Sequence, residues 1–268
     1  NVAALGSSVT MISVVGNDDD GRQLTALLQD NNINTEYLVS SHDRVTTNKI
    51  RIISRNQHMM RLDAEMAADM QSDDEEKLIH SFEKFIAAQK PDIVILEDYN
   101  KGVLTEYVIK SIISLCKKHG ILSAVDPKRK NFFTYNDVDI FKPNLKEVKD
   151  GLNLLTENIN ISALKEMHIL LQEKLNHRVS LITLSEKGVF YQQGNEAAII
   201  PTHIRSIADV SGAGDTVIAI ASLVFAVTKD AKLAAEMANI AGGLVCEEVG
   251  TVAIDKNKLL AECHQLLG

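Results

Sequence analysis

The chain has 268 residues, of which 45% are hydrophobic, and its formal net charge at pH 7 is −8. This length and composition predict one large buried core, and the acidic charge without a basic, aromatic-interleaved stripe argues against nucleic acid as a partner. No apolar run reaches the length of a bilayer and no basic leader opens the chain, so we expect a cytoplasmic protein with no membrane partner. The three cysteines lack Cys-x-x-Cys spacing, which predicts reduced thiols.

Short β-branched runs alternate with longer amphipathic stretches along most of the chain. In chain order we expect a strand at 9–15, a helix at 19–30, a strand at 92–96, a helix at 106–118, strands at 122–125 and 139–141, a helix at 161–175 and a strand at 179–184. This alternation is typical of parallel strands with helices on both faces. It predicts an α/β protein with a mostly parallel central sheet.

Residues 36–63 interrupt the alternation, because β-branched and basic residues follow one another there without a helix. We expect a small antiparallel sheet that projects from the core, with no other domain boundary in residues 1–268. It is either an ordinary edge hairpin or a lid, since its basic residues suit a phosphorylated ligand. They are Arg44, Lys49, Arg51, Arg55 and Arg61. The open sheet edge of a lid also predicts a homodimer formed through residues near 36–63.

A small loop, DVSGAGD at 209–215, precedes the longest apolar run of the chain. Gly212 and Gly214 allow a sharp turn and a close approach of backbone N–H groups to a ligand. The helix that starts here, expected to be buried on all sides over 216–227, adds unpaired N–H groups and a positive dipole end. Together these features predict a phosphate site.

Asp215 is unexpected in such a loop, because a carboxylate repels a phosphate. It either caps the helix or complements its dipole, or it accepts a hydroxyl proton while the neighbouring N–H groups hold a transferring phosphoryl group. The loop has neither the Lys-Ser/Thr pair of a Walker loop nor the N-terminal position of a dinucleotide fingerprint.

The D-x-x-G-A-G-D pattern of 209–215 resembles the C-terminal signature of the ribokinase-like (PfkB) carbohydrate kinases. The segments NVAALG, VVGNDDDGRQL and KPNLKE resemble other motifs of that family in the same order. The resemblance implies a three-layer α/β/α sandwich with a small projecting β lid. It also implies that Asp215 is the catalytic base and that Gly212, Ala213 and Gly214 form the anion hole. The chain begins inside the family's N-terminal glycine motif, so the first strand and an acidic sugar contact are expected to be missing.

The resemblance further implies ATP and Mg²⁺. Asn144 and Glu147 would organise Mg²⁺ through water, although the same spacing fits a helix N-cap with a capping-box glutamate. The implied nucleotide-binding residues, each of which also fits turn or helix-end chemistry, are Ser185, Glu186, Gly188, Asn239, Gly250 and Thr251.

Three segments, 46–63, 97–102 and 125–132, resemble the heptose 7-phosphate kinases of lipopolysaccharide precursor synthesis within this family. They imply phosphorylation of D-glycero-D-manno-heptose 7-phosphate at its anomeric hydroxyl, giving the 1,7-bisphosphate for ADP-heptose synthesis. The implied substrate-binding residues are Arg51, Arg55, Arg61, Asp98, Lys101 and Lys128. For the last three, a polar loop or a surface lysine is the alternative.

Two other functions stay open. One is a kinase of the same family for another sugar, sugar phosphate or nucleoside. The other is a non-catalytic sensor of nucleotides or sugar phosphates, against which Asp215 argues, because a pure binder gains nothing from a carboxylate beside its phosphate.

Overall fold

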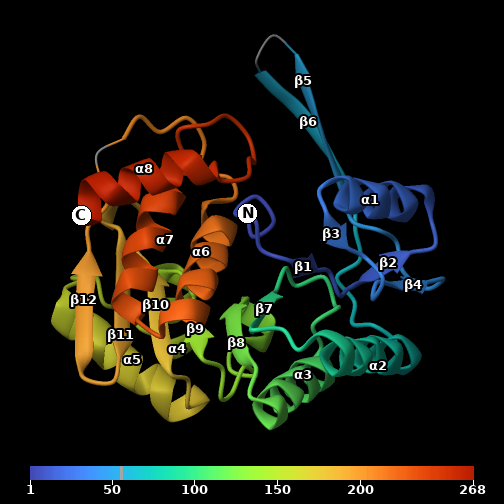
Figure 1. The fold of residues 1–268 in the computed structure, drawn as a ribbon, viewed down its shortest axis with the longest axis horizontal. Helices are drawn as coiled ribbons and strands as arrows, with labels where there is room; N and C mark the ends of the chain where they lie inside the picture. Colours follow the sequence, from blue (N-terminus) through green and yellow to red (C-terminus); the bar gives the residue numbers. More distant parts are fainter. Residues whose placement is uncertain (55–56, 204) are drawn as a thin grey trace. The chain divides into compact units, whose positions relative to one another are not determined.

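The computed structural model of the chain describes residues 1–54, 57–203 and 205–268, and they form two compact units (Figure 1). The first unit comprises Asn1–Ser7, Pro91–Tyr99 and Ile113–Gly268, and the second comprises Ser8–Lys90 and Asn100–Ile112. Helix α3 (Glu106–His119) contributes residues to both. Among the described residues, no helix is long and apolar enough to cross a membrane.

The first unit is built on a six-stranded sheet with the order β12-β11-β10-β9-β8-β7. Four neighbouring strands run parallel: β7 (Ile93–Glu97), β8 (Leu122–Asp126), β9 (Ile140–Phe141) and β10 (Val179–Thr183). Two antiparallel strands, β11 (Val189–Gln193) and β12 (Glu196–Ile200), complete the sheet. The remaining helices of this unit are α4 (Leu145–Leu152), α5 (Ile161–Leu175), α6 (Ala213–Thr228), α7 (Ala231–Val245) and α8 (Lys256–Leu267).

Alternate residues of β10 face different helices. Leu181 lies in the same buried cluster as Ile218 of α6. Ser180, one position earlier on the strand, places its Oγ 2.8 Å from Nδ1 of His168 on α5. Because both faces of the strand are covered, its first four residues are all buried, including Ser180. The sheet is therefore the middle layer of an α/β/α arrangement.

A buried polar group lies on the α5 face of the sheet. Ser180 Oγ is 2.6 Å from Nε2 of His177, in addition to its contact with His168, and all three side chains are at most 1% exposed. Burial, with a smaller effect of the neighbouring imidazole, lowers the pKa of His177 to about 3, and burial also lowers the pKa of His168. Both imidazoles are therefore neutral at pH 7.

The second unit holds three two-stranded sheets. The parallel pairs are β1 (Val9–Thr10) with β3 (Ile33–Asn34) and β2 (Val14–Gly16) with β4 (Val39–Ser41). The antiparallel pair is β5 (Asn48–Ser54) with β6 (Gln57–Ala64), and the helices are α1 (Asp19–Asp30), α2 (Ser72–Gln89) and the first residues of α3. The small antiparallel sheet predicted within 36–63 is thus present, as the hairpin β5–β6.

One face of this hairpin is apolar and exposed. The register pairs Ile50 with Leu62 and Ile52 with Met60, and these four side chains are 41–50% exposed. Within the described residues, neither strand pairs with any third strand.

Two expectations are corrected. The strand expected over 9–15 is two strands, because the chain changes partner between them: Met11 N–H donates to Asn34 O, whereas Ser13 O accepts from Val39. The apolar run of α6 is not buried on all sides either. Its residues from Thr216 to Ser222 are buried, but Val227, in the last turn, is 85% exposed.

Candidate active site

The carboxyl ends of three parallel strands bring charged side chains to one edge of the first unit's sheet. Glu97 is the last residue of β7, Asp126 is the last residue of β8, and Lys142 directly follows β9. Glu97 and Asp126 are register partners across the two strands. Ligands of open α/β sheets bind outside the carboxyl ends of the strands, so this edge is where a site is expected.

Helix α6 begins at the same edge. Its N-cap, Gly212, has φ 81° and ψ −1°, a left-handed conformation that favours glycine, so the turn predicted there is present. The first hydrogen bond of the helix runs from Thr216 N–H to Gly212 O. The N–H groups of Gly214 and Asp215 precede that bond and have no partner within the helix. Gly214 itself is helical, and a Cβ added there would lie 3.7 Å from Lys142 Nζ and 3.8 Å from Asp126 Oδ2.

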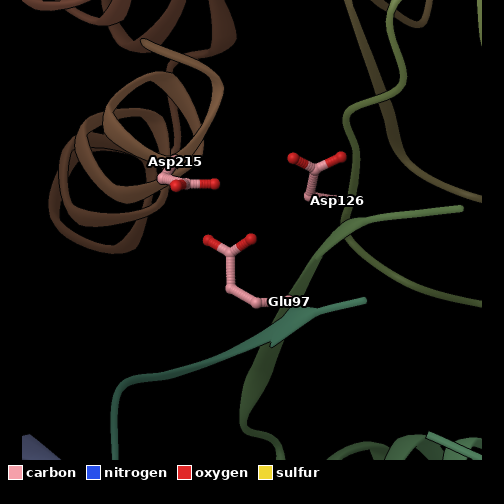
Figure 2. Close-up of side chains that lie close together, drawn as sticks. All are labelled: Glu97, Asp126 and Asp215. Carbon is pink, nitrogen blue, oxygen red and sulfur yellow. The ribbon is translucent and has the colours of Figure 1, made fainter. Parts of the chain in front are cut away.

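Three carboxylates converge in front of this helix. Figure 2 shows Glu97, Asp126 and Asp215 pointing toward one another from β7, β8 and α6. One oxygen of each lies within 4.8 Å of the others. Burial, reinforced by the negative charges of Asp126 and Asp215, raises the pKa of Glu97 to about 8. Glu97 therefore keeps its proton at neutral pH, which relieves the repulsion among the three groups.

Two lysines bracket Asp126. The Nζ of Lys142 lies 3.0 Å from Asp126 Oδ2, and this lysine is only 3% exposed. The Nζ of Lys128 lies 2.9 Å from Asp126 Oδ1 and 3.2 Å from Glu147 Oε1. Burial alone lowers the pKa of Lys128, but the two carboxylates outweigh it and raise the pKa above its ordinary value. The site thus pairs its negative charges with cations.

Asp98 and Tyr99 continue β7 with alternating directions. Asp98 is buried, and its Oδ2 accepts a hydrogen bond of 2.7 Å from the Tyr135 hydroxyl, so this carboxylate is committed to the interior of the unit. The Tyr99 side chain faces Asp215: burial, then the charge of Asp215 and a hydrogen bond to it, raise the pKa of the phenol. Glu97 and Tyr99 therefore share the site's face, while Asp98 lies on the other.

Asn144 and Glu147 form the capping box at the start of α4. Asn144 Oδ1 accepts from Glu147 N–H and Glu147 Oε2 accepts from Asn144 N–H, each over 2.8 Å. Glu147 Oε1 is the oxygen that contacts Lys128. The same residues remain suited to Mg²⁺ through water, because a carboxylate oxygen has lone pairs left for a metal-bound water. The carboxyl oxygens of Glu97, Asp126 and Asp215 are also hard donors at a spacing that suits a divalent cation, for which Glu97 would have to release its proton.

The residues predicted to bind nucleotide all lie in the first unit, in three segments. Ser185, Glu186 and Gly188 lie in and beside a 3₁₀ turn after β10, and Asn239 on α7 donates to Pro201 O over 2.9 Å. Gly250 N–H donates to Asp209 Oδ2 over 3.2 Å. That bond ties the 250–251 loop to the DVSGAGD loop, and Thr251 Cγ2 would lie 3.0 Å from a Cβ on Gly212.

The predicted basic substrate residues, apart from Lys128, lie in the second unit, where acidic partners neutralise several of them. Lys101 contacts Glu65 at 2.7 Å and Arg61 contacts Asp63 at 2.9 Å. Lys101 and Lys49 together hold the pKa of Glu65 at about 2. Arg51 lies on β5, at the position paired with Arg61, and Arg55 lies outside the described residues. Arg44, included in the predicted cluster, is instead buried and donates to the carbonyls of Ala68 and Lys101.

Sequence reasoning missed Glu97, Asp126 and Lys142 as site residues. Each occupies the position at or directly after the end of an expected parallel strand. The rule that such ends form ligand sites was the signal that points to all three.

Comparison with known proteins agrees with this geometry. A sequence model described as pfkB family carbohydrate kinase matches residues 1–258. The bifunctional protein HldE of Sulfurimonas denitrificans is 34% identical over 259 residues, which cover 97% of this chain and 53% of that protein. The chain thus spans about half the length of the curated relatives it matches.

Solved structures share the fold at low identity. Phosphofructokinase-2 from Escherichia coli in complex with potassium superposes with a TM-score of 0.84 at 17% identity, covering 100% of this chain and 85% of the other. Arabidopsis thaliana ribokinase complexed with ribose and ATP superposes with a TM-score of 0.74 at 18% identity, covering 97% and 83%. The ribokinase-like sandwich expected from the sequence is therefore confirmed.

Proposed function

Because the chain belongs to the pfkB family of carbohydrate kinases, we propose that it transfers the γ-phosphoryl group of ATP to the anomeric hydroxyl of D-glycero-D-manno-heptose 7-phosphate. One observation carries the chemistry: Asp215 lies in the first turn of α6, beside unpaired backbone N–H groups and beside the lysine-bracketed Asp126. We also propose a cytoplasmic reaction, where ATP is available and the free thiols of the chain remain reduced.

The phosphoryl group passes directly from ATP to the sugar oxygen, without a covalent enzyme intermediate. The sugar oxygen forms a bond to the γ-phosphorus as the bond from that phosphorus to the β–γ bridging oxygen breaks, and ADP leaves with the electron pair. The hydroxyl proton passes to the Asp215 carboxylate. The N–H groups of Gly212, Gly214 and Asp215 stabilise negative charge on the phosphoryl oxygens. The N–H of Ala213, which the family resemblance also assigns to the anion hole, donates to Val210 O over 3.3 Å.

Mg²⁺ would neutralise charge on the phosphates when bound. We propose that Asn144 and Glu147 hold it through water. Each of their side-chain oxygens already contacts a protein group, either in the capping box or at Lys128, but each still has lone pairs for a metal-bound water. Lys128 contacts both Glu147 and Asp126, so a metal held by Glu147 would lie at the same edge of the sheet as the carboxylate cluster.

The substrate assignment is supported by two observations. The similar HldE protein is named as bifunctional, and the match covers 97% of this chain and 53% of that protein. The hairpin sequence is the second: positions 51 and 61 are register partners and are both arginine, although Arg61 also contacts Asp63 at 2.9 Å. Arginines suit a substrate that already carries a phosphate.

A substrate panel tests the proposal. The full-length protein is incubated with Mg-ATP and D-glycero-D-manno-heptose 7-phosphate, fructose 6-phosphate, ribose or adenosine, and ADP release is measured. We expect selective turnover of the heptose phosphate, with a 1,7-bisphosphate identified by mass and NMR. Turnover of another compound would support the kinase assignment but refute the heptose phosphate as substrate. ATP binding without turnover would favour a non-catalytic sensor.

We further propose a homodimer formed through the hairpin, because its exposed apolar face would be covered by a second copy. Replacing both Ile52 and Leu62, which are 41% and 49% exposed, by glutamate is expected to give a monomer in analytical ultracentrifugation at micromolar concentration. The control is Leu155→Glu, since Leu155 is 94% exposed outside the hairpin. A wild-type protein that sediments as a monomer would contradict the dimer.

A further inference from the structure

Lys142 is a buried cation without enough acceptors. An ammonium group has three donors, yet among the described residues its only hydrogen-bonding or ionic partner is Asp126, at 3.0 Å. A lysine that is 3% exposed rarely remains so poorly paired, because burying a charge is costly unless it is paired and hydrogen-bonded. Its remaining donors therefore call for another acceptor.

The position of the ammonium indicates what that acceptor is. Its Nζ lies 3.7 Å from the point that a Cβ on Gly214 would occupy, so it lies against the first turn of α6. The unpaired N–H groups belong to the same turn that the ammonium contacts, and no side chain at residue 214 fills the space between Gly214 and the ammonium. An anion with several acceptor oxygens, such as a phosphoryl group, satisfies both sets.

Asp126 explains how two lysines can be held at this place. One of its oxygens contacts Lys142 and the other contacts Lys128. A carboxylate beside a phosphate site is unfavourable by itself, but here it fixes two positive charges, and Lys128 is also held by Glu147. This arrangement positions the cations before the nucleotide arrives, so their ordering costs nothing during the reaction.

We propose that Lys142 is a catalytic residue that donates to the phosphoryl group in transit, and that Asp126 is a positioning residue that holds Lys142 and Lys128 for it. The proposal rests on the proposed kinase function. During transfer, the bond to the β–γ bridging oxygen breaks and the bond to the sugar oxygen forms, while Lys142 keeps its proton throughout. Its role is to neutralise charge on the non-bridging oxygens.

The test separates phosphoryl contact from general folding. Lys142→Met, Lys142→Arg and the control Lys146→Met, whose side chain is 84% exposed on α4, are compared with the wild type. Calorimetry measures binding of AMP, ADP and a non-hydrolysable ATP analogue with an imido β–γ bridge. We expect Lys142→Met to weaken the ATP analogue about tenfold while AMP affinity stays within about twofold, as loss of one charge-assisted hydrogen bond predicts.

Activity provides the second readout. Lys142→Met is expected to lower kcat about 100-fold, as removal of one preorganised donor does, and Lys142→Arg to recover at least about a tenth of the wild-type value. Asp126→Asn, which keeps both lysines, is expected to lower kcat less than Lys142→Met does. Equal weakening of AMP and the ATP analogue, unchanged affinities, or wild-type kcat in Lys142→Met would overturn the proposal.

The calorimetric measurements distinguish failure of the Lys142 proposal from failure of the proposed kinase function. If the wild type binds the ATP analogue but phosphorylates no tested sugar, the kinase assignment fails, and the affinity ratio still decides whether Lys142 contacts the terminal phosphate. If the wild type binds no nucleotide, both are refuted. If Lys142→Met does not fold, Lys142→Arg and Asp126→Asn decide by the same ratio.

Discussion

Replacing Asp215 by asparagine is expected to lower kcat by about 10²-fold or more while ATP affinity is retained. The amide cannot accept the hydroxyl proton at neutral pH, although it fills the same space in the first turn of α6. Removing a negative charge beside the phosphates also removes a repulsion, so ATP affinity is expected to stay the same or to increase. The measurement is steady-state kinetics combined with calorimetric titration of ATP.

Two further variants make this result interpretable. Asp150→Asn removes an aspartate on α4 that pairs with Lys146 at 2.8 Å outside the carboxylate cluster, so it controls for loss of one acidic group. Glu97→Gln removes a group that is already protonated at neutral pH, so a much smaller loss is expected. Full activity in Asp215→Asn would refute Asp215 as the base, leaving interaction with the helix dipole as its role, because the N-cap of α6 is Gly212.

Acid is expected to destabilise the protein through His177. Its pKa is about 3 in the folded chain, against an ordinary value of 6.5, so the unfolded chain binds the extra proton first. The stability that this histidine contributes is complete above pH 6.5 and is lost as the pH falls from there toward 3. The expected slope is about 1.4 kcal/mol for each pH unit below 6.5.

Glu97 acts in the opposite direction and must be separated from His177. Its pKa is raised from 4.5 to about 8. The stability that Glu97 contributes is therefore complete below pH 4.5 and is lost as the pH rises through 8. The informative quantity is therefore the difference in the free energy of unfolding between wild type and His177→Gln, measured with urea at pH 7.5 and at pH 5.5. His80→Gln, whose side chain is 65% exposed, serves as the control. Parallel pH profiles for wild type and His177→Gln would contradict the assignment.

Local sequence signals predicted the ends of three helices closely, although no range was predicted for α2, α4, α7 or α8. Helices α1 and α5 begin and end at the expected residues, and α3 differs from its expected range at one end by a single residue. Caps explain this accuracy: Asp18 and Asn160 accept from the third helical N–H after them, so the start of each helix is encoded within four residues. The break at 11–13 could not be predicted in this way, since it depends on two strands distant in sequence.

The site was predicted only where one loop encodes it. The turn at Gly212 and the position of Asp215 follow from seven consecutive letters. The contacts of Lys142 and Lys128 with Asp126 join separate segments, so no local spacing reveals them. For Asn144 and Glu147, spacing left a capping box and a metal role open, and the capping box is present without removing the other. Roles of the nucleotide and substrate residues stay predictions.

Side chains alternate between two faces at the end of β7, so the number of residues in this strand decides which of them face the site. Glu97 and Tyr99 face Asp215, whereas Asp98 between them accepts from Tyr135 in the interior. Successive residues of a strand point to opposite faces, so deletion or insertion of one residue within 93–97 would exchange the two sets. A deletion would then bring Asp98 to the place of the protonated Glu97 beside the base, and the Tyr135 hydroxyl would lose its acceptor. We therefore expect this segment to accept many substitutions over evolution but no change in length.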